Sequence, residues 1–171
     1  QLAKNPFETK VSTAFRPDKA ILISNDGYNE YVNKLGEKVG ITINSYADLQ
    51  SALRNRIDFF DKNGCKLCDH GLDQVYFENY TESEVNAIFK KKRENGTLSS
   101  EEALKFQSAV LLFLSETYHE FGWVQQFHLG AQRLKRKLKC ISQELKLVRN
   151  LRNNTMEEEC ILMHFKCSKQ L

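Results

Sequence analysis

The chain has 171 residues, 41% hydrophobic and 27% charged, with a net charge of +3, which is typical of a globular domain with its own core. It contains no run of 18 apolar residues and no basic segment leading into an apolar one, so we expect no membrane partner and no signal peptide. Its five unevenly spaced cysteines argue against a secreted disulfide framework and favour the cytoplasm.

The charge is unevenly distributed along the chain. Residues 134–171 contain nine Lys or Arg against four Glu, whereas residues 1–133 carry a slight excess of acidic residues. A basic tail can favour nucleic acid, but no interleaved aromatic residues or binding motif accompany this one. We therefore expect no nucleic-acid partner, and we divide the chain into residues 1–133 and a basic tail, residues 134–171.

The first elements are a short strand and a helix. Residues 11–15 (VSTAF) are typical of a strand, and Pro17 should end it and begin a loop, because proline cannot continue a central ladder. Apolar residues then follow helical spacing from residue 28 to residue 39, and Gly40 should end that helix.

Three further helices each begin with a hydroxyl residue followed three positions later by an acidic one, which is the pattern of a capping box. The pairs are Ser45 with Asp48, Thr81 with Glu84, and Ser99 with Glu102. Glycine residues should stop these helices at positions 64, 96 and 122. Strands are predicted after the first and third of these helices, over residues 65–68 and 123–127.

The alternation of strands and helices predicts an α/β fold with parallel strands. Polar residues follow the carboxyl ends of the three predicted strands: Arg16 with Asp18, Asp69 with His70, and His128 with Arg133. In a (β/α)8 barrel, reacting groups converge from those positions, so we predict a partial TIM barrel of about three βα units. A doubly wound sheet would give the same alternation. After Arg133 we predict a helical C-terminal tail and no further strand.

Three short sequence motifs resemble those of a known family. They are residues 15–19 (FRPDK), 64–73 (GCKLCDHGLD) and 122–133 (GWVQQFHLGAQR). Residues 56–60 (RIDFF) also match the same family. In this order they resemble the uronate isomerases, over roughly residues 8–133. The resemblance implies a cytoplasmic barrel of the amidohydrolase superfamily. It also implies an aldose–ketose isomerase, an intramolecular oxidoreductase, acting on D-glucuronate to give D-fructuronate or on D-galacturonate to give D-tagaturonate.

The chain departs from the family pattern at both ends. It lacks the early His-x-His pair and the late Asp that hold the family's metal, so we expect no cofactor in this chain. For the full-length enzyme, the resemblance implies a divalent metal such as zinc. The tail after Arg133 resembles no part of the family. We interpret it as the result of a frameshift, a gene-prediction error or a truncation. We therefore expect a central fragment that is inactive alone. Its uncovered strand edges should make it form homo-oligomers, aggregate or fold poorly, unless the tail covers an edge.

Isomerisation of a sugar acid needs a cation for the carboxylate, a general base and a group that polarises the carbonyl. We assign substrate binding to Arg16, Arg133 and His70, and catalysis to Asp69 and His128. The same residues also allow structural interpretations. Arg16 would then form a surface ion pair, Asp69 a turn, and His128 part of the core, while His70 would face away because neighbouring strand positions point to opposite sides.

Two other functions stay open. Cys65 and Cys68 have metal-ligand spacing, and with Cys160, His164 and Cys167 they would form a small zinc-stabilised interaction module. The competing interpretation is that Cys65 and Cys68 pack beside a buried strand as small hydrophobic residues. The other function is that of a hydrolase from the same superfamily.

Overall fold

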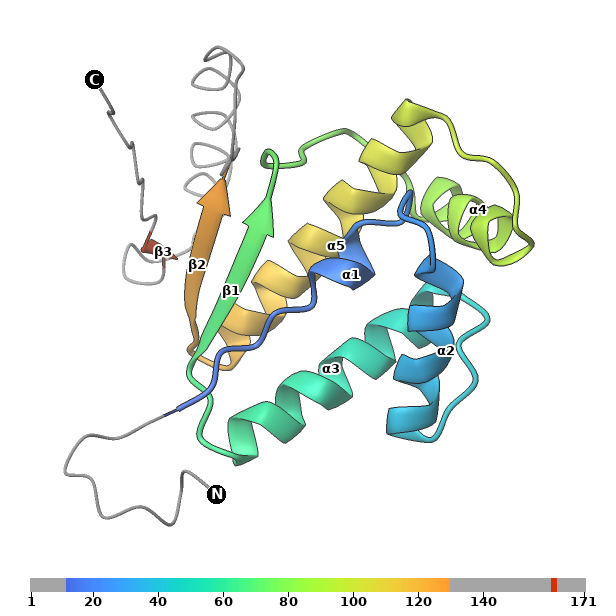
Figure 1. Ribbon diagram of the computed structural model, residues 1–171. Coiled ribbons are helices and arrows are strands. Elements are labelled where there is room, and N and C mark those ends of the chain that lie inside the picture. Colours follow the sequence, from blue (N-terminus) through green and yellow to red (C-terminus); the bar gives the residue numbers. More distant parts are fainter. Residues whose placement is uncertain (1–11, 130–160, 163–171) are drawn as a thin grey trace, which may run out of the picture.

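The computed structural model describes residues 12–129 and 161–162 (Figure 1). In chain order the elements are α1 (Asp18–Ile21), α2 (Tyr28–Val39), α3 (Tyr46–Lys62), β1 (Leu67–Leu72), α4 (Glu82–Arg93), α5 (Ser100–Glu120), β2 (Val124–Leu129) and β3 (Ile161–Leu162).

The four long helices begin where their sequences predict. The side chains of Ser45, Thr81 and Ser99 accept a hydrogen bond from the backbone three residues on, and the acidic residue there accepts one from the cap backbone. These hydrogen bonds confirm all three predicted capping boxes. Each box satisfies N–H groups at a helix start that would otherwise be unpaired. Gly40 ends α2 with a φ of 74°, a left-handed conformation that favours glycine.

The strands form a parallel sheet in the order β1, β2, β3, which confirms the α/β class. The strand predicted over residues 11–15 is a single bridge from Phe15 to Cys68 within the described residues. Two expectations are wrong: α1 replaces the predicted loop after Pro17, and β3 is a further strand after Arg133. The remainder of the predicted helical tail lies outside the described residues.

The first full strand also differs from its prediction in extent. β1 begins at Leu67 and continues to Leu72, so Asp69 and His70 lie inside the strand and not beyond its end. Their backbones pair with β2, where Asp69 is opposite Gln126 and His70 is opposite Phe127. Because side chains alternate along a strand, those of Asp69 and His70 point to opposite faces of the sheet.

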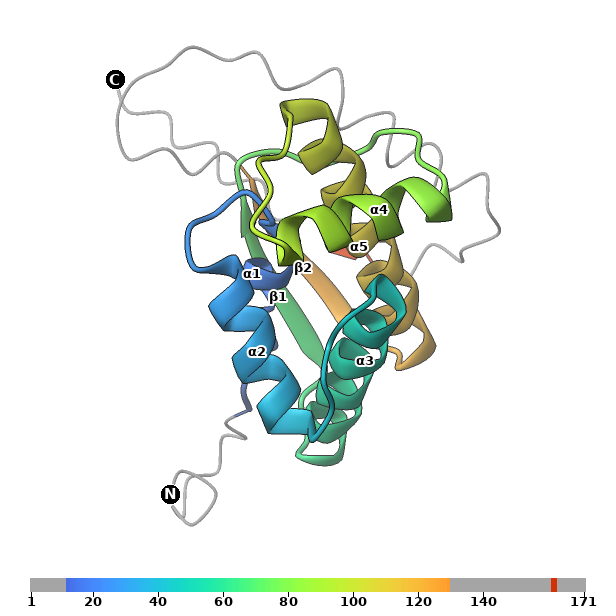
Figure 2. The same cartoon turned by 90° about the vertical axis from the view of Figure 1, so that its right-hand side faces the viewer.

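The helices lie on one face of the sheet. Figures 1 and 2 show α1, α3 and α5 on the same side of β1 and β2. The core forms between them: the buried rings of Tyr118 on α5 and Trp123 stack with centroids 5.7 Å apart, and Phe15 packs edge-on against both. This packing leaves the opposite face of β1 and β2 uncovered by α1, α3 and α5.

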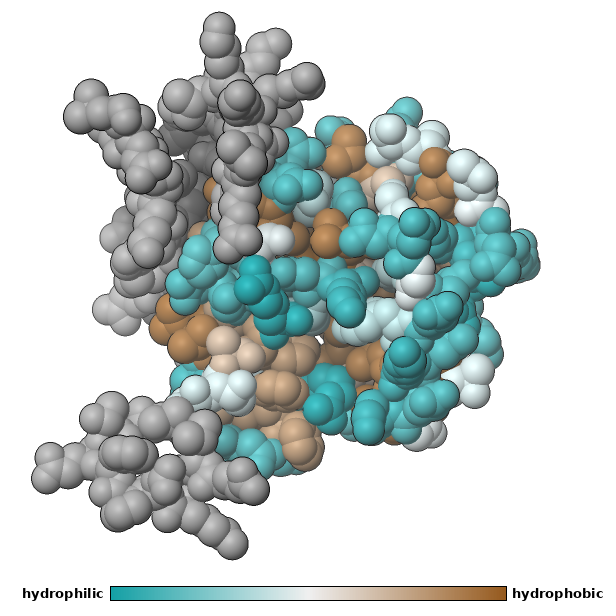
Figure 3. All heavy atoms as spheres, viewed as in Figure 1, coloured by the Kyte–Doolittle hydropathy of each residue, from teal (hydrophilic) through white to brown (hydrophobic). Residues whose placement is uncertain are grey.

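On the face that Figure 3 shows, hydrophilic residues (teal) are interspersed with smaller hydrophobic areas (brown). Among the residues that the structure describes, Phe59 is the most exposed of the large hydrophobic ones, at 50%. Within residues 12–129 and 161–162, no helix combines the length and the apolar character that crossing a bilayer requires.

Candidate active site

Side chains of β1 alternate between a covered and an open face. Cys68, His70 and Leu72 are buried, whereas Asp69 and Gly71 are only half-buried. The buried set faces α5, because the rings of His70 and Tyr118 lie 5.8 Å apart. Asp69 therefore belongs to the open face of the sheet.

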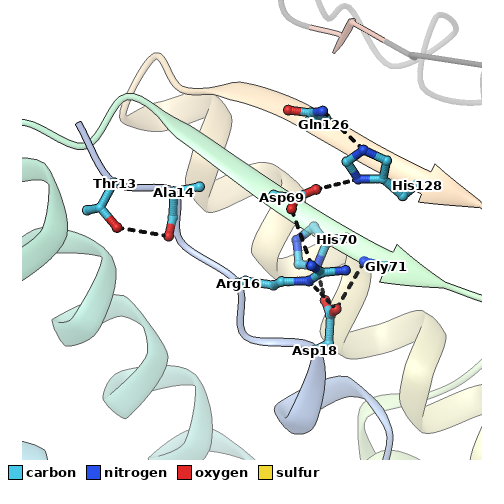
Figure 4. A network of polar contacts seen from close by, with 9 residues as sticks. All are labelled: Thr13, Ala14, Arg16, Asp18, Asp69, His70, Gly71, Gln126 and His128. Carbon is cyan, nitrogen blue, oxygen red and sulfur yellow. Dashed lines mark hydrogen bonds and ion pairs between the residues drawn. The ribbon is translucent and has the colours of Figure 1, made fainter. Parts of the chain in front are cut away.

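The open face holds a paired carboxylate and imidazole. Nδ1–H of His128 donates to Oδ1 of Asp69 at 2.6 Å, and the Gln126 amide lies 3.3 Å from Nε2 of the same ring (Figure 4). A carboxylate that accepts from Nδ1–H fixes the tautomer with its lone pair on Nε2. The His128 side chain is 41% exposed, and its Nε2 accepts from the Gln126 amide, so a ligand reaches this nitrogen by displacing Gln126.

Arg16 lies over the same face and joins two carboxylates. Its Nη1 is 3.4 Å from Oδ2 of Asp69, and its Nε donates to Oδ2 of Asp18 at 3.0 Å. Half of the Arg16 side chain stays exposed, at 52%. The two carboxylates thus fix the guanidinium over the open face of the sheet.

Asp18 is the centre of the polar network and was not among the predicted site residues. It accepts hydrogen bonds from Nε of Arg16, from the backbone N–H of Gly71 at 3.0 Å and from Nδ1–H of His70 at 2.8 Å. Burial alone would raise the pKa of Asp18, but the hydrogen bonds from His70, Gly71 and Arg16 lower it overall. Asp18 is therefore a carboxylate that the surrounding donors keep ionised.

His70 lies on the covered face and is fully buried. Its ring stacks on Phe127 with centroids 5.4 Å apart, and its Nε2 has no hydrogen-bond partner among the described residues. The expectation that His70 and Asp69 face opposite sides is confirmed. This burial disfavours the predicted contact between His70 and a substrate, and it favours a role in holding Asp18.

The described residues do not form a metal centre. They contain no group of three or more His, Cys, Asp or Glu side chains placed to hold a metal ion. Cys65 and Cys68 are both fully buried, and Sγ of Cys65 lies 3.1 Å from the backbone carbonyl oxygen of Thr13 and 3.2 Å from that of Leu67. Burial raises the pKa of the Cys68 thiol to about 12, so this sulfur is a poor thiolate ligand. Cys160, His164 and Cys167 lie outside the described residues.

Comparison with known proteins decides the family. The model of the glucuronate isomerase family matches residues 1–144. The chain belongs to this family. Among curated members, the uronate isomerase of Flavobacterium johnsoniae is 71% identical over 133 residues, which is 78% of this chain and 28% of that protein. The uronate isomerase of Phocaeicola vulgatus is 47% identical over 128 residues, 74% of this chain and 27% of that protein.

Two solved structures of uronate isomerases share the fold. The enzyme from Thermotoga maritima gives a TM-score of 0.79 at 20% identity, over 90% of this chain and 37% of that one. The glucuronate isomerase from Caulobacter crescentus gives a TM-score of 0.75 at 20% identity, over 95% of this chain and 37% of that one. The chain thus spans less than a third of the length of the two curated relatives.

Membership of the glucuronate isomerase family confirms the predicted resemblance, and the match continues past Arg133 to residue 144. Of the predicted site residues, the structure brings Arg16, Asp69 and His128 together, and it buries His70 beneath them. Arg133 lies outside the described residues. Sequence reasoning did not assign Asp18 to the site although it named the residue beside Arg16, and it did not single out Gly71.

Proposed function

We propose that this chain is a central segment of a uronate isomerase, part of an amidohydrolase-type (β/α)8 barrel that converts D-glucuronate to D-fructuronate or D-galacturonate to D-tagaturonate. The observation that carries the proposal is the joined set Arg16, Asp69 and His128 on one open face of a parallel sheet, in a chain of this family. Barrels place reacting groups at the carboxyl ends of parallel strands, and β2 ends just after His128.

Arg16 binds the carboxylate of the sugar acid. A guanidinium remains charged at any working pH and matches the two oxygens of a carboxylate. The ion pairs with Asp18 and Asp69 fix the planar group in position, so less side-chain entropy is lost when the anion binds. Arg133 is proposed as a second cation for the substrate.

His128 moves the proton between the two carbon atoms of the isomerisation. With Nδ1–H bound to Asp69, and with the Gln126 amide displaced by the substrate, the lone pair on Nε2 can accept a proton and return it to the neighbouring carbon. Asp69 holds the ring in that tautomer and stabilises the imidazolium that forms transiently. Gln126, 3.3 Å from Nε2, limits rotation of the ring.

The resemblance implies a divalent metal, with zinc as the proposed ion, in the full-length enzyme. The described residues do not fit a complete metal site, because no cluster of three suitable side chains occurs among them. The alternative of a zinc-stabilised interaction module receives little support from Cys65 and Cys68, which are buried.

A chimera tests the proposed function. Residues 1–133 of this chain would replace the matching segment of the Flavobacterium johnsoniae uronate isomerase, which is 71% identical over 133 residues. We expect the chimera to isomerise D-glucuronate, and the chain alone to give no turnover. Substituting His128→Asn in the chimera should lower kcat by about 100-fold or more, the usual contribution of a general base.

A matched control separates catalysis from folding. Asp61→Asn removes a carboxylate that accepts from Trp123 and Lys66, away from the open face, and should leave kcat within about twofold. A folded chimera without isomerase activity would contradict the proposed function. Equal kcat values for the His128→Asn chimera and the parent chimera would contradict the role given to His128.

A further inference from the structure

The guanidinium of Arg16 occupies space that exists only because residue 71 has no side chain. A Cβ atom at Gly71 would lie 1.9 Å from Nη2 of Arg16 and 3.1 Å from Cζ. Gly71 has no left-handed φ, so the backbone itself does not demand glycine. The close approach of Arg16 is therefore the physical reason for glycine here.

The backbone of Gly71 also helps to hold Asp18. Its N–H donates to Oδ2 of Asp18 at 3.0 Å, and the same oxygen accepts from Nε of Arg16. Nδ1–H of the fully buried His70 donates to the other oxygen. One strand, β1, thus supplies two donors that set the position of Asp18, and Asp18 sets the position of Arg16.

We propose that Gly71 and Asp18 are positioning residues that form a cradle for the Arg16 guanidinium and direct its remaining N–H groups toward the carboxylate of a hexuronate. This inference rests on the proposed function, since it concerns how the carboxylate is bound. Gly71 supplies the space and Asp18 the anchor, and neither touches the substrate.

The Gly71→Ala variant is the sharpest test, because the structure predicts opposite effects on folding and on binding. The added methyl group meets the far end of a flexible side chain, so Arg16 can swing away without strain in the strand. Alanine also restricts the unfolded chain more than glycine does. We expect the midpoint of urea unfolding to stay equal or rise, while the Kd for D-glucuronate rises about tenfold or more.

The binding assay is calorimetric titration of the 171-residue chain with D-glucuronate, for four proteins in a double-mutant cycle. These are the natural chain, Gly71→Ala, Arg16→Met and the double variant. If Gly71 acts only through Arg16, Gly71→Ala should weaken binding in the natural background and have no further effect beside Arg16→Met. An unchanged Kd for Gly71→Ala, or additive effects in the cycle, would overturn the proposal.

Failure of the chain to bind a uronate would count against the proposed function and not against the cradle. A second measurement tests the cradle without a uronate. The hydrogen bond from Arg16 Nε–H to Asp18 should give a slowly exchanging proton in the NMR spectrum of the natural chain. We expect that resonance to shift or disappear in both Gly71→Ala and Asp18→Asn. An identical Arg16 Nε–H resonance in the natural chain and Gly71→Ala would refute the cradle itself.

Discussion

Asp18→Asn gives a prediction whose magnitude follows from the structure. The Asp18 side chain is 15% exposed and accepts three hydrogen bonds, two of them from side chains able to carry charge. An asparagine has a single acceptor oxygen, so the variant leaves at least one donor unpaired, and the fully buried Nδ1–H of His70 is the costliest to lose. An unpaired buried donor costs about 1–3 kcal/mol, so we expect a loss of about 1–3 kcal/mol in the free energy of unfolding.

The loss should depend on pH in a defined direction. Because the pKa of Asp18 lies below its usual 3.8 in the folded chain, the stabilisation is fully present above that value. It disappears as the pH falls through the folded-state pKa. The difference in stability between the natural chain and Asp18→Asn should therefore be constant near neutrality and shrink below about pH 4.

Urea unfolding followed by tryptophan fluorescence is the assay, since Trp123 is the single tryptophan and is fully buried. Asp26→Asn is the matched control: Asp26 is exposed, forms no hydrogen bond within the described residues, and should change stability by less than about 0.5 kcal/mol. Equal stability of Asp18→Asn and the natural chain at pH 7 would refute the reasoning. So would a difference that stays constant down to pH 3.

Three further predictions concern the core, a helix cap and the buried thiols. Leu53→Ala, at a side chain 1% exposed, should cost about 2–5 kcal/mol in urea unfolding, whereas Phe59→Ala, at a side chain 50% exposed, should cost far less; similar losses would contradict the assigned core. Ser99→Ala removes the N-cap of α5 and should cost about 1 kcal/mol by the same assay, and no loss would argue against the capping box. Cys65 and Cys68 should resist alkylation by iodoacetamide at pH 8 until urea unfolds the chain, because both are buried and the pKa of Cys68 is raised to about 12. Peptide mapping measures the alkylation, and rapid alkylation of the folded chain would contradict this packing.

Helix starts were predictable because their rules are local. Ser45, Thr81 and Ser99 each precede an acidic residue by three positions, and that short pattern alone satisfies the first N–H groups of a helix. β1 was harder, since polar Asp69 and His70 resemble a loop that follows a strand. They are strand residues because partners on both faces bind their side chains.

The polar network could be predicted only in part from the sequence. The motifs containing Arg16, Asp69 and His128 identified the residues, but the bonds from Asp18 to His70 and Gly71 span 52 and 53 positions. No local pattern encodes such contacts, and the packing of α1 against β1 determines them. The two-residue strand β3 depends in the same way on pairing with β2, so periodicity could not reveal it.

The most direct test of the account is an NMR titration of the chain with D-glucuronate, with D-glucose as the matched sugar that lacks a carboxylate. Binding through the open face predicts saturable shifts for Arg16 Nε–H, the backbone of Asp69 and Gly71, and the His128 ring, with D-glucose causing much smaller changes. Shifts confined to the helical layer, equal responses to both sugars, or no response would contradict a hexuronate site on this face.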